Sequence, residues 1–66
     1  MNEFSMKLKQ FRWSQDMTIR EFADSLNMNH FTYACYEKGN RKPSLRLLKE
    51  LALVYNIDLN EWVLGV

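Results

Sequence analysis

The sequence predicts an all-helical protein, and three observations support this prediction. Apolar residues recur at the spacing of amphipathic helices, most clearly at Ile19, Phe22, Ala23 and Leu26. Helix-capping residues precede such stretches, and no segment shows the alternation of a strand or the turn of a hairpin. With 66 residues, 47% of them hydrophobic, the chain suffices for one packed domain spanning 1–66. We therefore expect a compact bundle of five helices.

The first two expected helices have recognisable ends. The first covers about residues 2–15 and carries its apolar side chains at helical spacing. The second begins after Thr18, which lies three residues before Glu21, the spacing of a capping box. Its apolar stripe stops at Asn27, a residue type that tolerates the left-handed conformation of a helix exit.

Three further helices are expected in the second half of the chain. Asn29 caps the third helix, and Gly39 stops it. Ser44 caps the fourth, which runs to about residue 56, and a short fifth helix extends to about residue 64. Only about three residues separate the second helix from the third, which is the arrangement of a helix-turn-helix unit.

Residues at fixed spacing along most of the chain form a more specific pattern. They are Leu8, Phe11, Arg12, Thr18, Phe22, Ala23, Leu26, Tyr33, Tyr36, Glu37, Gly39, Pro43, Ser44, Leu45, Ile57, Asp58 and Leu59. Through them the chain resembles the Cro and phage-repressor (XRE-type) family of small helix-turn-helix regulators. The resemblance implies a lambda-repressor-like fold and a sequence-specific, repressor-like transcriptional regulator of phage or prophage type, with the third helix in the major groove of double-stranded DNA. It also implies a buried, structural ion pair between Arg12 and Glu37.

The third helix has an unusual outer face. With its two tyrosines turned inward, a rotation of about 100° per residue places His30, Phe31 and Cys35 outward, with Thr32 beside them. The resemblance implies polar side chains that bond to base edges here, yet two of these are apolar. Either Phe31 and Cys35 contact thymine methyl groups while His30 and Thr32 donate or accept hydrogen bonds, or the face binds a protein partner. The second hypothesis describes an antirepressor, repressor modulator or antitoxin-like interaction module.

Charge is unevenly distributed, although the net charge is only +1. All nine basic residues lie in 1–49, and residues 50–66 carry only acidic ones, which predicts one positive end. The resemblance implies that the loop after the third helix follows the DNA backbone, and that position 19 holds a phosphate-bonding Gln, where this chain has Ile19. The candidates for phosphate contact are Thr18, Arg20, Asn29, Lys38, Asn40, Arg41 and Lys42.

The fourth helix has more apolar side chains than one face can bury. Those expected to point inward are Leu45, Leu48, Leu51, Ala52 and Tyr55. Those expected at a dimer or partner surface are Leu47, Val54, Trp62 and Leu64. A homodimer is the simplest account, since the resemblance implies two-fold symmetric DNA sites, and tighter packing within one chain is the alternative. Neither account uses Trp13.

The sequence offers no recognisable site for catalysis, a cofactor or a metal. One cysteine, with a single histidine in the whole chain, excludes an internal disulfide and a structural zinc site. No paired carboxylates, activated nucleophile or phosphate-binding glycine loop is present. The longest apolar run, residues 51–55, is far short of a membrane span, and no secretion signal opens the chain. We expect a cytoplasmic protein that is not an enzyme and binds neither a membrane nor a small-molecule substrate.

Overall fold

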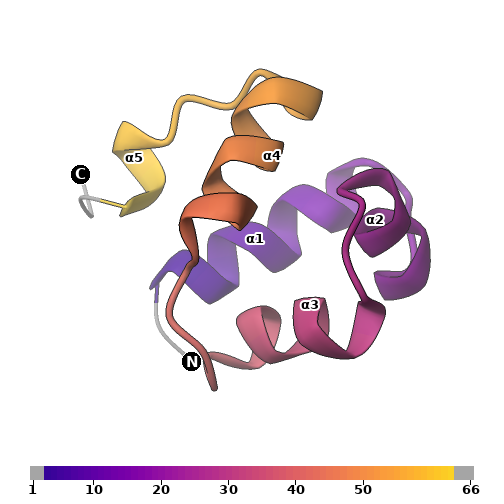
Figure 1. The fold of residues 1–66 in the computed structure, drawn as a ribbon. Coiled ribbons are helices and arrows are strands. Elements are labelled where there is room, and N and C mark those ends of the chain that lie inside the picture. Colours follow the sequence, from indigo (N-terminus) through magenta and orange to yellow (C-terminus); the bar gives the residue numbers. More distant parts are fainter. Residues whose placement is uncertain (1–2, 64–66) are drawn as a thin grey trace.

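The computed structural model describes residues 3–63, and all regular structure in that range is helical. The elements are α1 (Glu3–Ser14), α2 (Ile19–Ser25), α3 (His30–Lys38), α4 (Leu45–Tyr55) and α5 (Asn60–Val63). In Figure 1, α3 lies along the lower side of the molecule with α1 above it, and α4 and α5 lie on the upper side. The all-helical prediction is confirmed, but the last element is a single four-residue turn, so the bundle itself consists of four helices.

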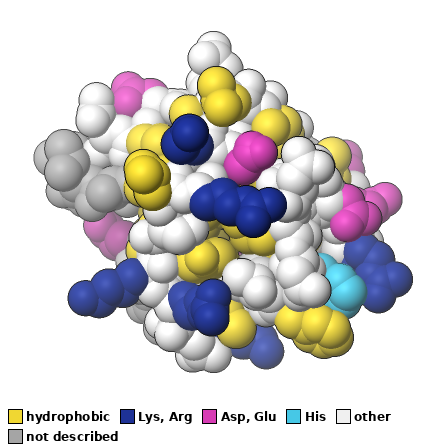
Figure 2. Space-filling view, viewed as in Figure 1, with side chains coloured by type: hydrophobic (Ala, Val, Ile, Leu, Met, Phe, Trp, Pro, Cys, Tyr) yellow, Lys and Arg dark blue, Asp and Glu magenta, His cyan; other side chains and the backbone are white. Residues whose placement is uncertain are grey.

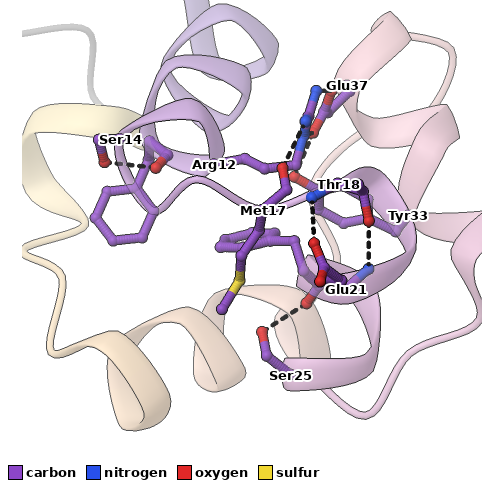
Figure 3. Close-up of polar contacts among 10 residues, drawn as sticks. Arg12, Ser14, Met17, Thr18, Glu21, Ser25, Tyr33 and Glu37 are labelled. Carbon is purple, nitrogen blue, oxygen red and sulfur yellow. Dashed lines mark hydrogen bonds and ion pairs between the residues drawn. The ribbon is translucent and has the colours of Figure 1, made fainter.

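The N-terminal ends of the helices follow the predicted caps. The Thr18 hydroxyl accepts a hydrogen bond from the backbone N–H of Glu21 at 3.1 Å, and the Glu21 carboxylate accepts one from the N–H of Thr18 at 2.9 Å (Figure 3). This reciprocal pair is a capping box at the start of α2. Asn29 caps α3, and Ser44 caps α4 by accepting from the N–H of Leu47.

The C-terminal ends depend on residues in the left-handed conformation. Asp16, Asn27, Gly39 and Asn56 have φ of 56°, 54°, 77° and 55°, and each lies one or two residues after the last residue of a helix. After α1, α2 and α3, the next N–H bonds to the carbonyl five residues earlier, which is the pattern of a Schellman motif. The sequence predicts this role for Asn27 and Gly39, and the structure adds the other two, because short polar side chains also tolerate this conformation.

One aromatic ring links all four helices of the bundle. Phe22, on α2, is fully buried and stacks on Tyr55 of α4 with 5.1 Å between ring centroids. The same ring contacts Tyr33 of α3 at 5.3 Å and Phe11 of α1 at 6.0 Å. The short α2, only seven residues long, is therefore held by tertiary packing rather than by its own helical propensity.

The inward face of α4 differs from the prediction. Leu47, expected at a dimer surface, is fully buried with Leu51, whereas Leu45, expected inside, is 74% exposed. Most positions of α4 are apolar, so the sequence pattern alone does not select which side turns inward. Packing against the other helices decides it, and Leu47 belongs to the core.

Trp62 also lies elsewhere than predicted. Its half-buried ring packs edge-on against two side chains of α1, with centroid distances of 6.0 Å to Phe4 and 5.7 Å to Phe11. The available edge-to-face partners on α1 explain why it is not a free surface residue. Val54 is exposed as expected, and Leu64 lies outside the described residues.

The cap of α4 gives a test of this fold. Replacing Ser44 with Ala leaves the N–H of Leu47 without its acceptor, and we expect the free energy of unfolding to fall by about 1 kcal/mol. Urea denaturation measures the loss. The matched control is Ser14→Ala, because Ser14 is exposed and caps no helix start, so its effect should stay within about 0.5 kcal/mol. Equal stability of Ser44→Ala and the parent would contradict the assigned cap.

Candidate nucleic-acid interface

A buried polar cluster fixes α3 relative to α1. Arg12 reaches from α1 to Glu37 on α3, donating from Nε to Oε2 at 2.6 Å and from Nη2 to Oε1 at 3.0 Å (Figure 3). The Tyr33 hydroxyl donates to the same Oε2 at 2.5 Å, and Arg12 Nη1 donates to the carbonyl of Met17 at 2.9 Å. The predicted Arg12–Glu37 ion pair is therefore confirmed, and it also anchors the segment between α1 and α2.

The cluster satisfies its buried charges internally. Arg12 is 9% exposed and Glu37 3% exposed. The hydrogen bonds that Arg12 donates to Glu37 raise the pKa of Arg12 above its ordinary value, although burial acts in the opposite direction. Burial raises the pKa of Tyr33, and its hydrogen bond to Glu37 raises that pKa further. Arg12 thus stays charged and Tyr33 stays a donor across the physiological range, and both groups are committed to holding α3 in place.

The opposite side of α3 faces solvent. Phe31 is 73% exposed, while His30, Thr32 and Cys35 are partly exposed. The rings of His30 and Phe31 are neighbours, with 4.4 Å between their centroids. The four predicted base-contact residues therefore line one surface, which we call the α3 outer face, with Phe31 and Cys35 one helical turn apart at its centre.

The seven predicted phosphate-contact residues are all exposed. Three precede α3, on α2 or at a helix cap, and four lie at the end of α3 or in the loop after it. Over α3 and this loop, the face drawn in Figure 2 shows Lys and Arg side chains without Asp or Glu. Exposed basic side chains therefore border the α3 outer face.

Two of these candidates already have partners within the chain. Arg20 Nη2 lies 3.5 Å from His30 Nε2, which brings α2 and α3 together at the edge of the outer face. The side-chain oxygen of Asn29 accepts from the N–H of Phe31 at 2.8 Å and of Thr32 at 3.3 Å. Because that oxygen is an acceptor engaged in capping, only the amide nitrogen of Asn29 is suited to bond a phosphate.

Arg46 is a positioning residue that sequence reasoning missed. Its Nη2 donates to the carbonyl of Asn27 at 2.6 Å and so ties α4 to the turn between α2 and α3. In the sequence Arg46 is one of several basic residues after α3, and nothing in the spacing distinguishes it. Asn27 has the left-handed conformation, and its carbonyl accepts this bond from α4.

Residues 3–63 contain neither a metal-binding cluster nor a membrane-spanning helix. No group of three or more His, Cys, Asp or Glu side chains is placed there to hold a metal ion. None of the described helices is long and apolar enough to cross a membrane.

A short turn joins α2 to α3, and the outer face of α3 points away from the rest of the bundle. This is the arrangement of a helix-turn-helix unit. A family model described as helix-turn-helix matches residues 8–62. The chain belongs to the helix-turn-helix family. Its α2 and α3 are the two helices of the motif, with four residues between them, and the resemblance to phage-repressor-like regulators is confirmed.

Curated relatives of this helix-turn-helix protein are named as transcriptional regulators. The cryptic phage CTXphi transcriptional repressor RstR of Vibrio cholerae is 33% identical over 60 residues, or 91% of this chain. The chain spans about half of that relative, 54% of its length. Two uncharacterized HTH-type transcriptional regulators of Archaeoglobus fulgidus are each 33% identical over 55 residues, or 83% of this chain, and it covers 79% and 78% of them. No solved structure gives a significant match.

The buried cluster gives the second test. Replacing Glu37 with Ala strands the Arg12 guanidinium without a carboxylate, and we expect a loss of roughly 3–5 kcal/mol in the free energy of unfolding. A domain of this size has little stability to spare, so the variant should be largely unfolded by circular dichroism at 25 °C. The control is Glu3→Ala, since Glu3 is an exposed carboxylate of α1 and its removal should change little. Parent-like thermal unfolding of Glu37→Ala would reject the structural role of the pair.

Proposed function

We propose that this protein is a repressor-like transcriptional regulator that binds specific double-stranded DNA sites with α3 in the major groove. The observation that carries the proposal is that α3 exposes a phenylalanine, Phe31, and that exposed cations lie near both ends of this helix. Membership of the helix-turn-helix family supports it, as do relatives named as a phage repressor and as regulators. An α-helix with its side chains is about 10–12 Å across, which fits a major groove about 12 Å wide.

The α3 outer face is suited to thymine and to a polar base edge. Phe31 and Cys35 present an apolar surface one turn long, which matches thymine methyl groups. His30 and Thr32, at the sides of that surface, supply groups that donate or accept hydrogen bonds. A buried phenylalanine contributes roughly 1.5–3 kcal/mol, and Phe31, at 73% exposure, forgoes most of this in the free protein. Burial of Phe31 against the DNA would recover this free energy.

The cations around this face are suited to the DNA backbone. Lys38, Arg41 and Lys42 are exposed at the C-terminal end of α3 and in the following loop, and Arg20 is exposed near its N-terminal end. Lysine and arginine that neutralise phosphates release counterions, so binding by these residues would depend steeply on salt. They orient the protein on the duplex, while the α3 outer face selects the sequence.

Binding to DNA from around its own gene, compared with random duplex, tests the function. We expect Phe31→Ala to weaken binding to the specific duplex by about 1–3 kcal/mol and to leave binding to random duplex nearly unchanged. Arg41→Ala should weaken both alike and reduce the salt dependence by about one counterion. Fluorescence anisotropy at two salt concentrations measures both, with Lys7→Ala as the control, because Lys7 lies on α1 and is not among the predicted DNA contacts. No preference of the parent for any gene-derived duplex would contradict the proposal and favour the protein-interaction alternative.

We also propose that the regulator acts as a homodimer through α4. Leu45 and Leu53 are 74% and 76% exposed, and Val54 is 46% exposed. The first two border a shallow groove of about 410 Å³ that also includes Lys49 and Glu50. In a two-fold symmetric contact each residue meets the same surface of the second copy, so antiparallel α4 helices would pair Lys49 with Glu50 across the axis. The proposed contact therefore replaces the predicted one through Leu47 and Trp62.

A charge inserted on α4 tests the dimer. We expect Leu53→Asp to shift sedimentation equilibrium toward the monomer at concentrations where the parent is dimeric, because a buried unpaired carboxylate opposes association. Met6→Asp is the matched control, since Met6 is an exposed apolar residue on α1. A parent that sediments as a monomer at hundreds of micromolar would overturn this contact.

A further inference from the structure

Arg46 belongs to two surfaces of the molecule. Its side chain lines the shallow groove of α4 together with Leu45 and Leu53, where we propose that a second copy binds. Its Nη2 also donates to the carbonyl oxygen of Asn27, in the turn between α2 and α3, at 2.6 Å. One exposed side chain therefore connects the proposed dimer surface with the helix-turn-helix unit.

The peptide group that accepts this hydrogen bond is held from both sides. The carbonyl of Asn27 and the N–H of Met28 belong to the same planar unit. That N–H donates to the carbonyl of Ala23 on α2 at 3.0 Å, while the carbonyl accepts from Arg46 on α4. Because the planar unit rotates as a whole, the bond from Arg46 opposes its rotation and thereby steadies the turn.

The orientation of this peptide affects the start of α3. Asn29, directly after Met28, caps α3 by accepting from the N–H groups of Phe31 and Thr32. His30 and Phe31 are the first two residues of α3 and belong to its outer face. A change in the turn would therefore displace the side chains at which the proposed recognition surface begins.

The bond from Arg46 to Asn27 is open to solvent in a single copy of the chain. Both residues are exposed, so water competes for the guanidinium and for the carbonyl. A long exposed arginine also loses much rotamer freedom when it keeps one geometry. A second copy packed on Leu45 and Leu53 would cover the aliphatic stem of Arg46, restrict that freedom and exclude water from the bond.

We propose that Arg46 couples dimer formation to the position of the α2–α3 turn, so that the dimer holds α3 in its DNA-binding position more firmly than the monomer does. The inference rests on the proposed homodimer and on the proposed role of α3. The two coupled sites are the groove of α4 and the outer face of α3. Linkage makes the coupling reciprocal, so a duplex bound at α3 strengthens the dimer by the same factor.

Amide hydrogen exchange of Met28 measures the coupling, because its N–H belongs to the peptide group that Arg46 holds. The parent above its dimer dissociation constant supplies the dimer, and Leu53→Asp supplies the monomer. We expect exchange at Met28 to be about fivefold slower in the parent, at the lower end of typical couplings. In the Arg46→Gln background, which lacks the guanidinium, adding Leu53→Asp should leave the exchange rate at Met28 unchanged.

Lys49→Gln is the matched control for this cycle. It removes the same charge from the same groove, whereas the bond to Asn27 comes from Arg46, so the parent's difference at Met28 should remain. Sedimentation equilibrium gives the dimer dissociation constant of each protein and thus the concentration for each measurement. A duplex that contains one half of the specific site should tighten the parent dimer by about the same factor and should not tighten that of Arg46→Gln.

The outcomes separate this coupling from the proposals on which it rests. Equal exchange at Met28 in the dimeric parent and in Leu53→Asp would overturn the coupling and leave both the dimer and the α3 interface intact. Slowing that persists in the Arg46→Gln dimer would overturn the role of Arg46. A parent that stays monomeric at hundreds of micromolar would overturn the dimer and the coupling together, and a dimer that binds no duplex would overturn the DNA-binding function.

Discussion

The buried ion pair between Arg12 and Glu37 is the interaction on which the rest of this structure depends. Through Glu37 it engages Tyr33 of α3, and through Nη1 of Arg12 it holds the carbonyl of Met17 before α2. A nine-residue helix is too short to be stable alone, so α3 exists only because its inner side is tied to α1 and packed against the core. These contacts fix the rotation of α3 about its own axis. The tyrosines turn inward, and the outer face that we propose for DNA has no alternative orientation.

That outer face departs from the polar surface that the family resemblance implies. Phe31 and Cys35 occupy its centre, so an interface built on them depends on shape and apolar contact more than on hydrogen bonds. In the proposed complex, the exposed cations around it attract phosphate in a way that does not depend on sequence. A net charge of only +1 is compatible with this arrangement, because Lys38, Arg41 and Lys42 are exposed together at the end of α3 and in the following loop.

Local signals in the sequence predict most of the fold, and non-local packing accounts for what they miss. Thr18, Asn29, Ser44 and Gly39 mark helix ends through contacts within a few residues, so their roles are visible in the sequence. The side of α4 that turns inward is different, because apolar residues surround this helix and only packing into the core decides that Leu47 is buried.

Amide chemical-shift mapping of the labelled protein with a specific duplex tests the central claim most directly. If α3 is the recognition helix held by the Arg12–Glu37 pair, the largest shifts fall on His30 to Cys35 and on the loop from Lys38 to Lys42. The buried tyrosines of α3 keep their native side-chain contacts throughout the titration. Shifts concentrated instead on the exposed side of α4, with α3 unaffected, would contradict the account.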